Sequence, residues 1–216
     1  MPVFRLTKEL IFPEPELAEE DGLLAVGGDL SEDRLLLAYS MGIFPWYADG
    51  SPILWWSPDP RLVLILDELK VSRSLRQVIK KGVFTVTMNT AFDEVIRNCS
   101  GISRSGQRDT WITEEMIEAY IRLHCAGYAH SVESWHDSEL VGGLYGVVLG
   151  KAFFGESMFA TKSNASKVAL VTLVEHLRKL DFSFIDCQVT TVHLKSLGAK
   201  EVTRKRFLHM LEKALA

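Results

Sequence analysis

The sequence contains no proline after residue 60. All seven prolines lie in the first 60 of the 216 residues. The early part of the chain is therefore predicted to be rich in turns, whereas the later part can form long, regular helices and strands. A composition break this sharp predicts a boundary between two domains. We place a small N-terminal domain at residues 1–60 and a larger domain at residues 61–216.

Cysteines and long apolar runs are also scarce. Cys99, Cys125 and Cys187 are scattered, which fits thiols in a reducing cytoplasm better than a disulfide framework. No apolar run approaches the length that crosses a bilayer, and the N-terminus lacks the plan of a signal peptide. We therefore expect a cytoplasmic protein with no membrane partner. The net charge of −4 means that only a local basic patch could hold a nucleic acid.

Several catalytic motifs are missing as well. The six histidines never adopt metal-ligand spacing, so no metal site is predicted. Gly27-Gly28-Asp29 follows an apolar run, but no Lys-Ser/Thr pair follows it, which excludes a Walker-type phosphate loop. The segment 155–159 starts like a nucleophile elbow, yet Phe159 replaces the second glycine. A reaction on an already activated substrate, needing positioning and proton handling, remains.

Regular patterns dominate after residue 60. Strands are predicted at residues 62–66, 83–88, 129–136, 139–149, 151–159 and 182–189. Helices are predicted at residues 32–41, 72–81, 91–97, 113–126, 166–180 and 204–215. The three strands between residues 129 and 159 are expected to be consecutive and antiparallel. This order predicts an α+β fold in which helices cover the faces of a sheet.

Two of the strand patterns hold a carboxylate among apolar residues. Strand alternation puts Glu156 on one face with Phe154 and Met158, and Asp186 on one face with Gln188. Because burying an unpaired carboxylate is costly, each should be neutralised, hydrogen-bonded or aimed into a cleft with a polar or cationic ligand. Two such groups predict a site. The alternative for Asp186 is a carboxylate paired structurally within the sheet.

The predicted helix at residues 72–81 is basic, with no acid between residues 69 and 82. Its cations form either a solvated helix face or a patch that follows nucleic-acid phosphates. Two tryptophans, Trp46 on a proline-stiffened turn and Trp111 at the end of a polar loop, are placed like platforms for base stacking. Trp55 and Trp56 fit equally well as a hydrophobic plug between the two domains.

Eight motifs give the chain a resemblance to a known family. They are GLLAVGGDLS (22–31), GIFPWY (42–47), ILWWSPDPR (53–61), TWIT (110–113), VGGLYGV (141–147), FGESMF (154–159), NASK (164–167) and IDCQ (185–188). Together they resemble leucyl/phenylalanyl-tRNA–protein transferases over nearly the whole chain. The resemblance implies a bacterial cytoplasmic enzyme that moves leucine or phenylalanine, with methionine as a further candidate, from aminoacyl-tRNA to proteins beginning with Arg or Lys. The products are then marked for degradation.

The resemblance also implies a fold and a set of roles. A small N-terminal domain should pack on a catalytic domain resembling Gcn5-related acetyltransferases, a mixed sheet with helices on both faces. Because an aminoacyl ester is already activated, no cofactor is implied. Asp186 and Gln188 would be the catalytic pair at the acceptor amine, with the ribose hydroxyl of the tRNA as an alternative proton acceptor. Glu156 would bind the free amine of the aminoacyl group.

Further substrate contacts follow from the same resemblance. Trp46 and Trp111 would hold the terminal adenosine. The pocket for the leucine or phenylalanine side chain would be lined by residues that any core also contains, namely Leu144, Phe153, Leu170, Leu173 and Ile185. The acceptor-stem phosphates would meet Arg73, Arg76, Lys80 and Lys81.

Two other functions are compatible with the pattern. A coenzyme-A-dependent N-acetyltransferase could share the fold, but it needs a glycine-containing turn before the helix that meets the pyrophosphate. Residues 160–166 contain no glycine. A non-catalytic RNA-binding module would account for the basic helix and the tryptophans, yet it gives no purpose to Glu156, Asp186 and Gln188.

Overall fold

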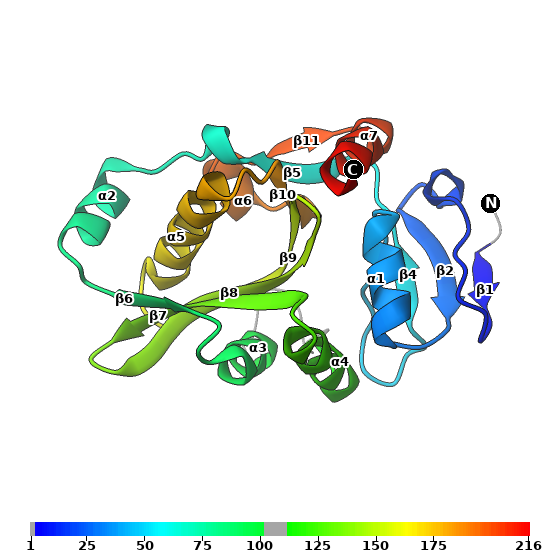
Figure 1. Ribbon diagram of the computed structural model, residues 1–216, viewed down its shortest axis with the longest axis horizontal. Helices are drawn as coiled ribbons and strands as arrows, with labels where there is room; N and C mark the ends of the chain where they lie inside the picture. Colours follow the sequence, from blue (N-terminus) through cyan, green and yellow to red (C-terminus); the bar gives the residue numbers. More distant parts are fainter. Residues whose placement is uncertain (1–2, 102–111) are drawn as a thin grey trace.

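The computed structural model describes residues 3–101 and 112–216. In these ranges the chain forms two sheets (Figure 1). The small sheet has the order β1-β2-β4-β3 and consists of β1 (Phe4–Leu6), β2 (Leu23–Gly27), β3 (Phe44–Pro45) and β4 (Leu54–Trp56). It was not predicted, because its strands are short and lie among prolines and glycines.

The large sheet has the order β11-β5-β10-β9-β8-β7-β6. Its strands are β5 (Arg61–Ile65), β6 (Thr85–Met88), β7 (Ala129–His136), β8 (Glu139–Leu149), β9 (Ala152–Ala160), β10 (Phe184–Gln188) and β11 (Lys200–Val202). The predicted antiparallel run β7-β8-β9 is confirmed, whereas β9 and β10 pair in parallel. The sheet is therefore mixed.

The helices fall close to their predicted positions. They are α1 (Glu32–Ser40), α2 (Arg73–Lys80), α3 (Phe92–Gly101), α4 (Glu114–Cys125), α5 (Ala165–Lys179), α6 (Val192–Ser196) and α7 (Arg204–Leu215), with short 3-10 turns at Pro15–Leu17 and Leu66–Glu68. Only α6, a five-residue helix, was not predicted. Within the described ranges, no helix combines the length and hydropathy needed to cross a bilayer.

Two adjacent glycines in β8 show that helices cover both faces of the large sheet. A Cβ on Gly142 would lie 2.5 Å from the Cβ of Ala165 in α5, and a Cβ on Gly143 would lie 3.2 Å from Val95 in α3. Because neighbouring strand residues point to opposite faces, α5 and α3 lie on opposite sides of β8 (Figure 1). The predicted α+β class, with helices on both faces of a mixed sheet, is confirmed.

One hydrophobic core joins the N-terminal region to the large sheet. It contains Leu24 and Trp55 from the small sheet together with Phe154 and Phe207 from β9 and α7. Trp55 is fully buried, and its indole N–H donates to the carbonyl of Gly27 at 2.8 Å. Trp55 is therefore a core residue, and its predicted place between two domains stays a prediction.

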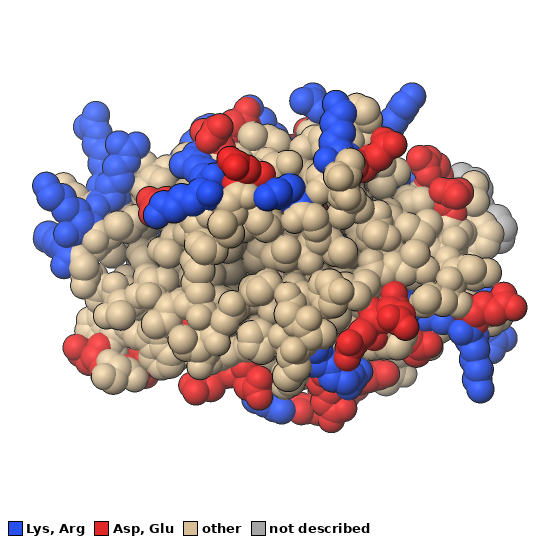
Figure 2. Space-filling model, in the orientation of Figure 1, with Lys and Arg blue, Asp and Glu red and all other residues tan. Residues whose placement is uncertain are grey.

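Helix α2 lies at the end of the molecule opposite the small sheet. Figure 2 shows Lys and Arg side chains gathered there. Leu75 is buried, and Val71 and Val78 pack beside it against Val168 and Val171 of α5. The exposed cations of this end, Arg73, Arg76, Lys80 and Lys81, have no salt-bridge partner among residues 3–101 and 112–216. We call these four residues the basic helix patch.

The close approach of α5 to β8 gives a stability prediction. Gly142→Ala places a methyl group 2.5 Å from Ala165 and 3.0 Å from the backbone of α5, so the helix must shift outward. We expect the free energy of unfolding to fall by about 1–3 kcal/mol, as for other overpacked sites. Gly101→Ala, which meets nothing within 4 Å, is the matched control. Urea denaturation measures both variants, and equal stabilities would contradict this account of the packing.

Candidate active site

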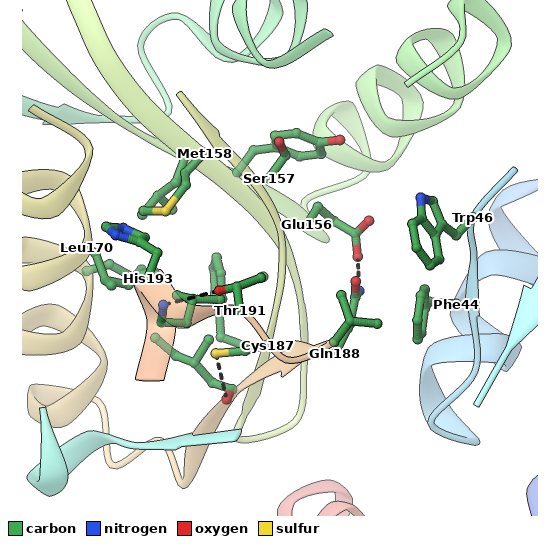
Figure 3. Close-up of a pocket in the computed structure, with 18 of the residues that line it drawn as sticks. Phe44, Trp46, Glu156, Ser157, Met158, Leu170, Cys187, Gln188, Thr191 and His193 are labelled. Atoms are coloured by element: carbon green, nitrogen blue, oxygen red, sulfur yellow. Dashed lines mark hydrogen bonds between the residues drawn. The ribbon is translucent and has the colours of Figure 1, made fainter. Parts of the chain in front are cut away.

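A cavity of about 580 Å³ opens between the large sheet, α5, α6 and the N-terminal region. Most of its lining is apolar. The five residues predicted to form the side-chain pocket all line it, namely Leu144, Phe153, Leu170, Leu173 and Ile185. Glu156, Gln188 and Trp46 line the same cavity. In Figure 3, Phe44 and Trp46 lie on one side of the Glu156–Gln188 pair, and Met158, Leu170 and His193 lie on the other.

Irregularities in β9 and β10 aim the polar residues into this cavity. Gly155 and Ser157 pair with the consecutive residues Gly146 and Tyr145, so Glu156 is the extra residue of a bulge. In β10 the register shifts between Asp186 and Gln188. Bulges redirect side chains next to active sites. The strict alternation used in the sequence prediction therefore fails here: Gln188 lines the cavity, and Asp186 is not among its lining residues.

Glu156 is buried and held entirely by neutral donors. Tyr39 donates to Oε1 at 2.7 Å, Tyr120 donates to Oε2 at 3.0 Å, and the Gln188 side-chain amide donates to Oε1 at 2.8 Å. The two tyrosine hydroxyls are 2.5 Å apart. No Lys or Arg in the described part of the chain forms a salt bridge with Glu156. The carboxylate thus depends on hydrogen bonds rather than on an ion pair.

The pKa of Glu156 is raised to about 7, chiefly by burial and also by the nearby Asp186 carboxylate, while the three hydrogen bonds oppose the shift. Burial and the negative field of Glu156 also raise the pKa of Tyr39 and of Tyr120 well above 10.0. Both tyrosines therefore stay protonated and act as donors. Glu156, by contrast, can change its charge near neutral pH.

Asp186 occupies a different environment. It is 0% exposed, and Arg61, which is 1% exposed, holds it with a two-pronged ion pair. Arg61 Nε lies 2.9 Å from Oδ1, and Nη2 lies 2.6 Å from Oδ2. The main-chain N–H of Gln188 also donates to Oδ1 at 2.9 Å. This is the structurally paired carboxylate that the sequence left open as the alternative for Asp186.

The remaining predicted residues are spread over the molecule. Trp46 is partly buried, lines the cavity, and packs against Trp56 with ring centroids 5.7 Å apart. Trp111 and the polar loop before it lie outside the described residues. The basic helix patch does not line the cavity, but α5 packs against α2 through Val168 and Val171 while contributing Leu170 and Leu173 to the pocket.

Sequence reasoning missed Tyr39, Tyr120 and Arg61. A tyrosine at a buried helix position signals that its hydroxyl needs a partner. The partner itself could not be found, because Tyr39 and Glu156 are 117 residues apart in the chain. Arg61 offered a similar signal as a cation at the start of an apolar strand. Among the described residues, no group of three or more His, Cys, Asp or Glu is arranged to hold a metal ion.

The environment of Glu156 gives a pH-dependent prediction. Between the unfolded pKa near 4.5 and the folded pKa of about 7, the unfolded state loses this proton first, so ionisation favours unfolding. Glu156→Gln cannot ionise. We expect wild-type stability to fall relative to Glu156→Gln by about 3 kcal/mol as the pH rises through this window.

Urea unfolding at several pH values measures this difference. Glu139→Gln, which removes an exposed carboxylate from β8, is the control and should track the wild type. A difference between wild type and Glu156→Gln that does not vary with pH would contradict the raised pKa.

Comparison with known proteins finds matches over nearly the whole chain. The family model described as leucyl/phenylalanyl-tRNA protein transferase matches residues 63–212, and that of its N-terminal domain matches residues 28–59. A leucyl/phenylalanyl-tRNA–protein transferase from Syntrophobacter fumaroxidans is 65% identical over 211 residues, covering 98% of this chain and 90% of that protein. One from Anaeromyxobacter sp. is 58% identical over 215 residues, covering 100% and 92%.

Solved structures are much more distant. FemX aligns with a TM-score of 0.48 at 12% identity, covering 80% of this chain and 66% of that one, a similarity too low to draw on. The family models and the close relatives therefore determine the family assignment. The chain belongs to the leucyl/phenylalanyl-tRNA–protein transferase family.

Proposed function

We propose that this protein transfers leucine or phenylalanine, with methionine as a further candidate, from aminoacyl-tRNA to the α-amine of proteins that begin with Arg or Lys. The reaction takes place in the cytoplasm and marks the acceptors for degradation. The observation that carries the proposal is the apolar cavity bordered by Glu156 and Gln188. Such a cavity offers one compartment for a side chain and one polar edge for amines.

The apolar part of the cavity supports the choice of amino acid. Its lining of Leu144, Phe153, Leu170, Leu173 and Ile185 offers no charged partner to a polar side chain. Polar residues would therefore lose their hydration without compensation. The β-branched side chains of isoleucine and valine are rejected by shape, which is the main discrimination available to an apolar pocket.

Glu156 is suited to hold the free amine of the aminoacyl group. An ionised carboxylate offers about four acceptor positions, and Tyr39, Tyr120 and Gln188 occupy three of them. The remaining position can accept a hydrogen bond from an amine in the cavity. The two tyrosines and the glutamine fix the direction in which that position points.

Gln188 is suited to orient the acceptor amine. Its side-chain nitrogen donates to Glu156, and its side-chain oxygen, which has no hydrogen-bond partner among the described residues, can accept from an N–H of the acceptor. The amine nitrogen attacks the ester carbonyl carbon, a C–N bond forms, and the C–O bond to the terminal ribose breaks. The amine loses a proton and the departing ribose oxygen gains one, so neither ATP nor a cofactor is consumed.

Two routes remain for that proton. Its removal is assisted by Gln188 with support from Asp186, or the proton is taken directly by the ribose hydroxyl of the tRNA. Asp186 can act only through Gln188, because it is fully buried and not part of the cavity lining. The amine has a reference pKa of roughly 8, so proton removal at neutral pH needs only modest assistance.

The tRNA body is assigned to the basic helix patch. Trp46 and Trp111 hold the terminal adenosine, and Arg73, Arg76, Lys80 and Lys81 contact acceptor-stem phosphates. The four cations are exposed, and their positive charge supports phosphate binding on a chain whose net charge is negative. Such contacts follow backbone shape and do not depend on base identity.

The coenzyme-A-dependent acetyltransferase is not favoured. Asn164 precedes α5 in a left-handed conformation, and no glycine lies between Ala160 and Ser166 to let main-chain N–H groups approach a pyrophosphate. Membership of the transferase family also argues against it.

A transfer assay tests the proposed function. Leucyl-tRNA and phenylalanyl-tRNA are each incubated with the protein and with two peptides that differ only in the first residue, Arg or Ala. We expect transfer to the Arg peptide and little transfer to the Ala peptide. Equal use of both peptides would refute the acceptor preference. Binding of acetyl-CoA, measured by calorimetry, would instead support the rival.

Matched charge variants test the basic helix patch. Arg76→Gln/Lys80→Gln removes two exposed cations from α2, whereas Lys205→Gln/Arg206→Gln removes two exposed cations from α7. We expect the α2 variant to bind tRNA more weakly and to reduce the slope of log K against log salt by about 1–2. The α7 variant should behave as wild type. If both variants change the slope equally, the binding is not local to α2.

A further inference from the structure

Arg61 is a buried cation next to the site, held by several contacts. It is the first residue of β5, and its guanidinium lies between two aromatic rings, 4.7 Å from the ring centre of Phe44 and 4.5 Å from that of Phe207. Phe44 comes from β3, and Phe207 comes from α7. Three segments far apart in the chain thus fix the plane of one side chain.

This plane fixes Asp186. The guanidinium of Arg61 donates to both carboxylate oxygens, from Nε to Oδ1 at 2.9 Å and from Nη2 to Oδ2 at 2.6 Å. The main-chain N–H of Gln188 also donates to Oδ1. Bidentate pairs of this kind define geometry as well as charge. Asp186 is buried and does not border the cavity, so its contact with the reaction runs through Gln188.

Gln188 needs such support. Its φ of 60° lies in the left-handed region, which costs a residue with a side chain free energy unless its surroundings enforce it. Two hydrogen bonds do so here. The main-chain N–H donates to Asp186 at 2.9 Å, and the side-chain amide donates to Glu156 at 2.8 Å.

We propose that Arg61 is a positioning residue for the transfer reaction. It orients Asp186, Asp186 holds the backbone of Gln188 in its left-handed conformation, and this conformation presents the Gln188 side chain to Glu156 and to the acceptor amine. The inference rests on the proposed function for its catalytic consequence. It assigns Asp186 an anchoring role, because Asp186 is separated from the cavity and bound by Arg61 and by the Gln188 N–H.

A graded series of Arg61 variants distinguishes a positioning role from simple charge neutralisation. Arg61→Lys keeps the positive charge but loses the planar fork, and Arg61→Met loses both. We expect kcat to fall by about tenfold in Arg61→Lys and about 100-fold in Arg61→Met, as for a small displacement of a reacting group. The KM for aminoacyl-tRNA should stay within about threefold in both, because Arg61 does not itself line the cavity and the basic helix patch is untouched.

Arg34→Met is the matched control. Arg34 is also 1% exposed and donates to the carbonyls of Thr7 and Glu9, at 3.0 Å and 3.1 Å, away from the cavity lining. We expect this variant to lose stability but to keep the kcat of the wild type at a temperature where it is folded. A kcat for Arg61→Lys within about twofold of the wild type would overturn the inference, since the charge alone would then suffice.

Hydrogen exchange provides a readout that needs no substrate. The Gln188 amide should exchange about tenfold faster in Arg61→Lys than in the wild type, while the Leu144 amide in β8 is unchanged. In Arg34→Met, any acceleration should affect both amides together. Unchanged Gln188 exchange in Arg61→Lys would refute the positioning role even if transfer is slowed.

The two proposals can fail separately. A wild-type protein that transfers nothing to the Arg peptide would refute the proposed function, and the Gln188 exchange rate would still decide whether Arg61 sets the local geometry. A wild-type protein that transfers normally, with Arg61 variants equally active, would refute only the role of Arg61. Arg61→Lys keeps the buried charge paired, so the test does not depend on Arg61→Met being folded.

Discussion

The buried carboxylate of Glu156 is the constraint on which the site depends. It lies on β9, and its three donors come from α1, α4 and β10. Because an unsatisfied buried carboxylate is costly, the folded state is favoured only when these four elements meet. Tyr39 belongs to the N-terminal region, and the other three residues belong to the large sheet and to helix α4. The polar edge of the cavity therefore exists only when the two parts of the chain are packed together.

The two acidic residues of the site are neutralised in different ways, and their roles follow from this. Asp186 is paired with a guanidinium, which fixes both its charge and its orientation. Glu156 is held by hydroxyl and amide groups, and burial brings its pKa to about 7, close to neutral pH. Neighbouring carboxylates in contrasting environments commonly divide the work of a site. Here Asp186 is suited to hold geometry, and Glu156 is suited to meet a ligand.

Much of the large sheet and its helices could be predicted from sequence because their patterns are local. Polar and apolar residues alternate in 129–159, which predicts β7, β8 and β9. Apolar residues recur at helical spacing in 166–180, which predicts α5, and neither pattern has many competing interpretations. The five pocket residues came from the resemblance to the family, since their composition alone is that of any core. The small sheet was missed because strands of two to five residues between prolines and glycines give almost no periodic signal.

The polar geometry could not be predicted for a different reason. A bulge shifts every following side chain to the other face, yet it leaves no mark in the alternation of polar and apolar residues. The register shift between Asp186 and Gln188 therefore ended their expected placement on one face of β10, and a separate bulge in β9 redirects Glu156. Long-range partners were equally hidden. Arg61 and Asp186 are 125 residues apart, and only the pairing of β5 with β10 brings them together.

Helix α5 links the two halves of the proposed substrate site. Val168 and Val171 face α2, while Leu170 and Leu173 face the cavity, so one rigid helix sets the spacing between the basic helix patch and the pocket. Phosphates bound at α2 would position the acceptor end of a tRNA without reading its bases. The pocket would then select only for the side chain of the attached amino acid. On the proposed assignment, this separation would let a single site accept two different tRNAs: they share a backbone shape, and their amino acids share an apolar side chain without a branch at Cβ.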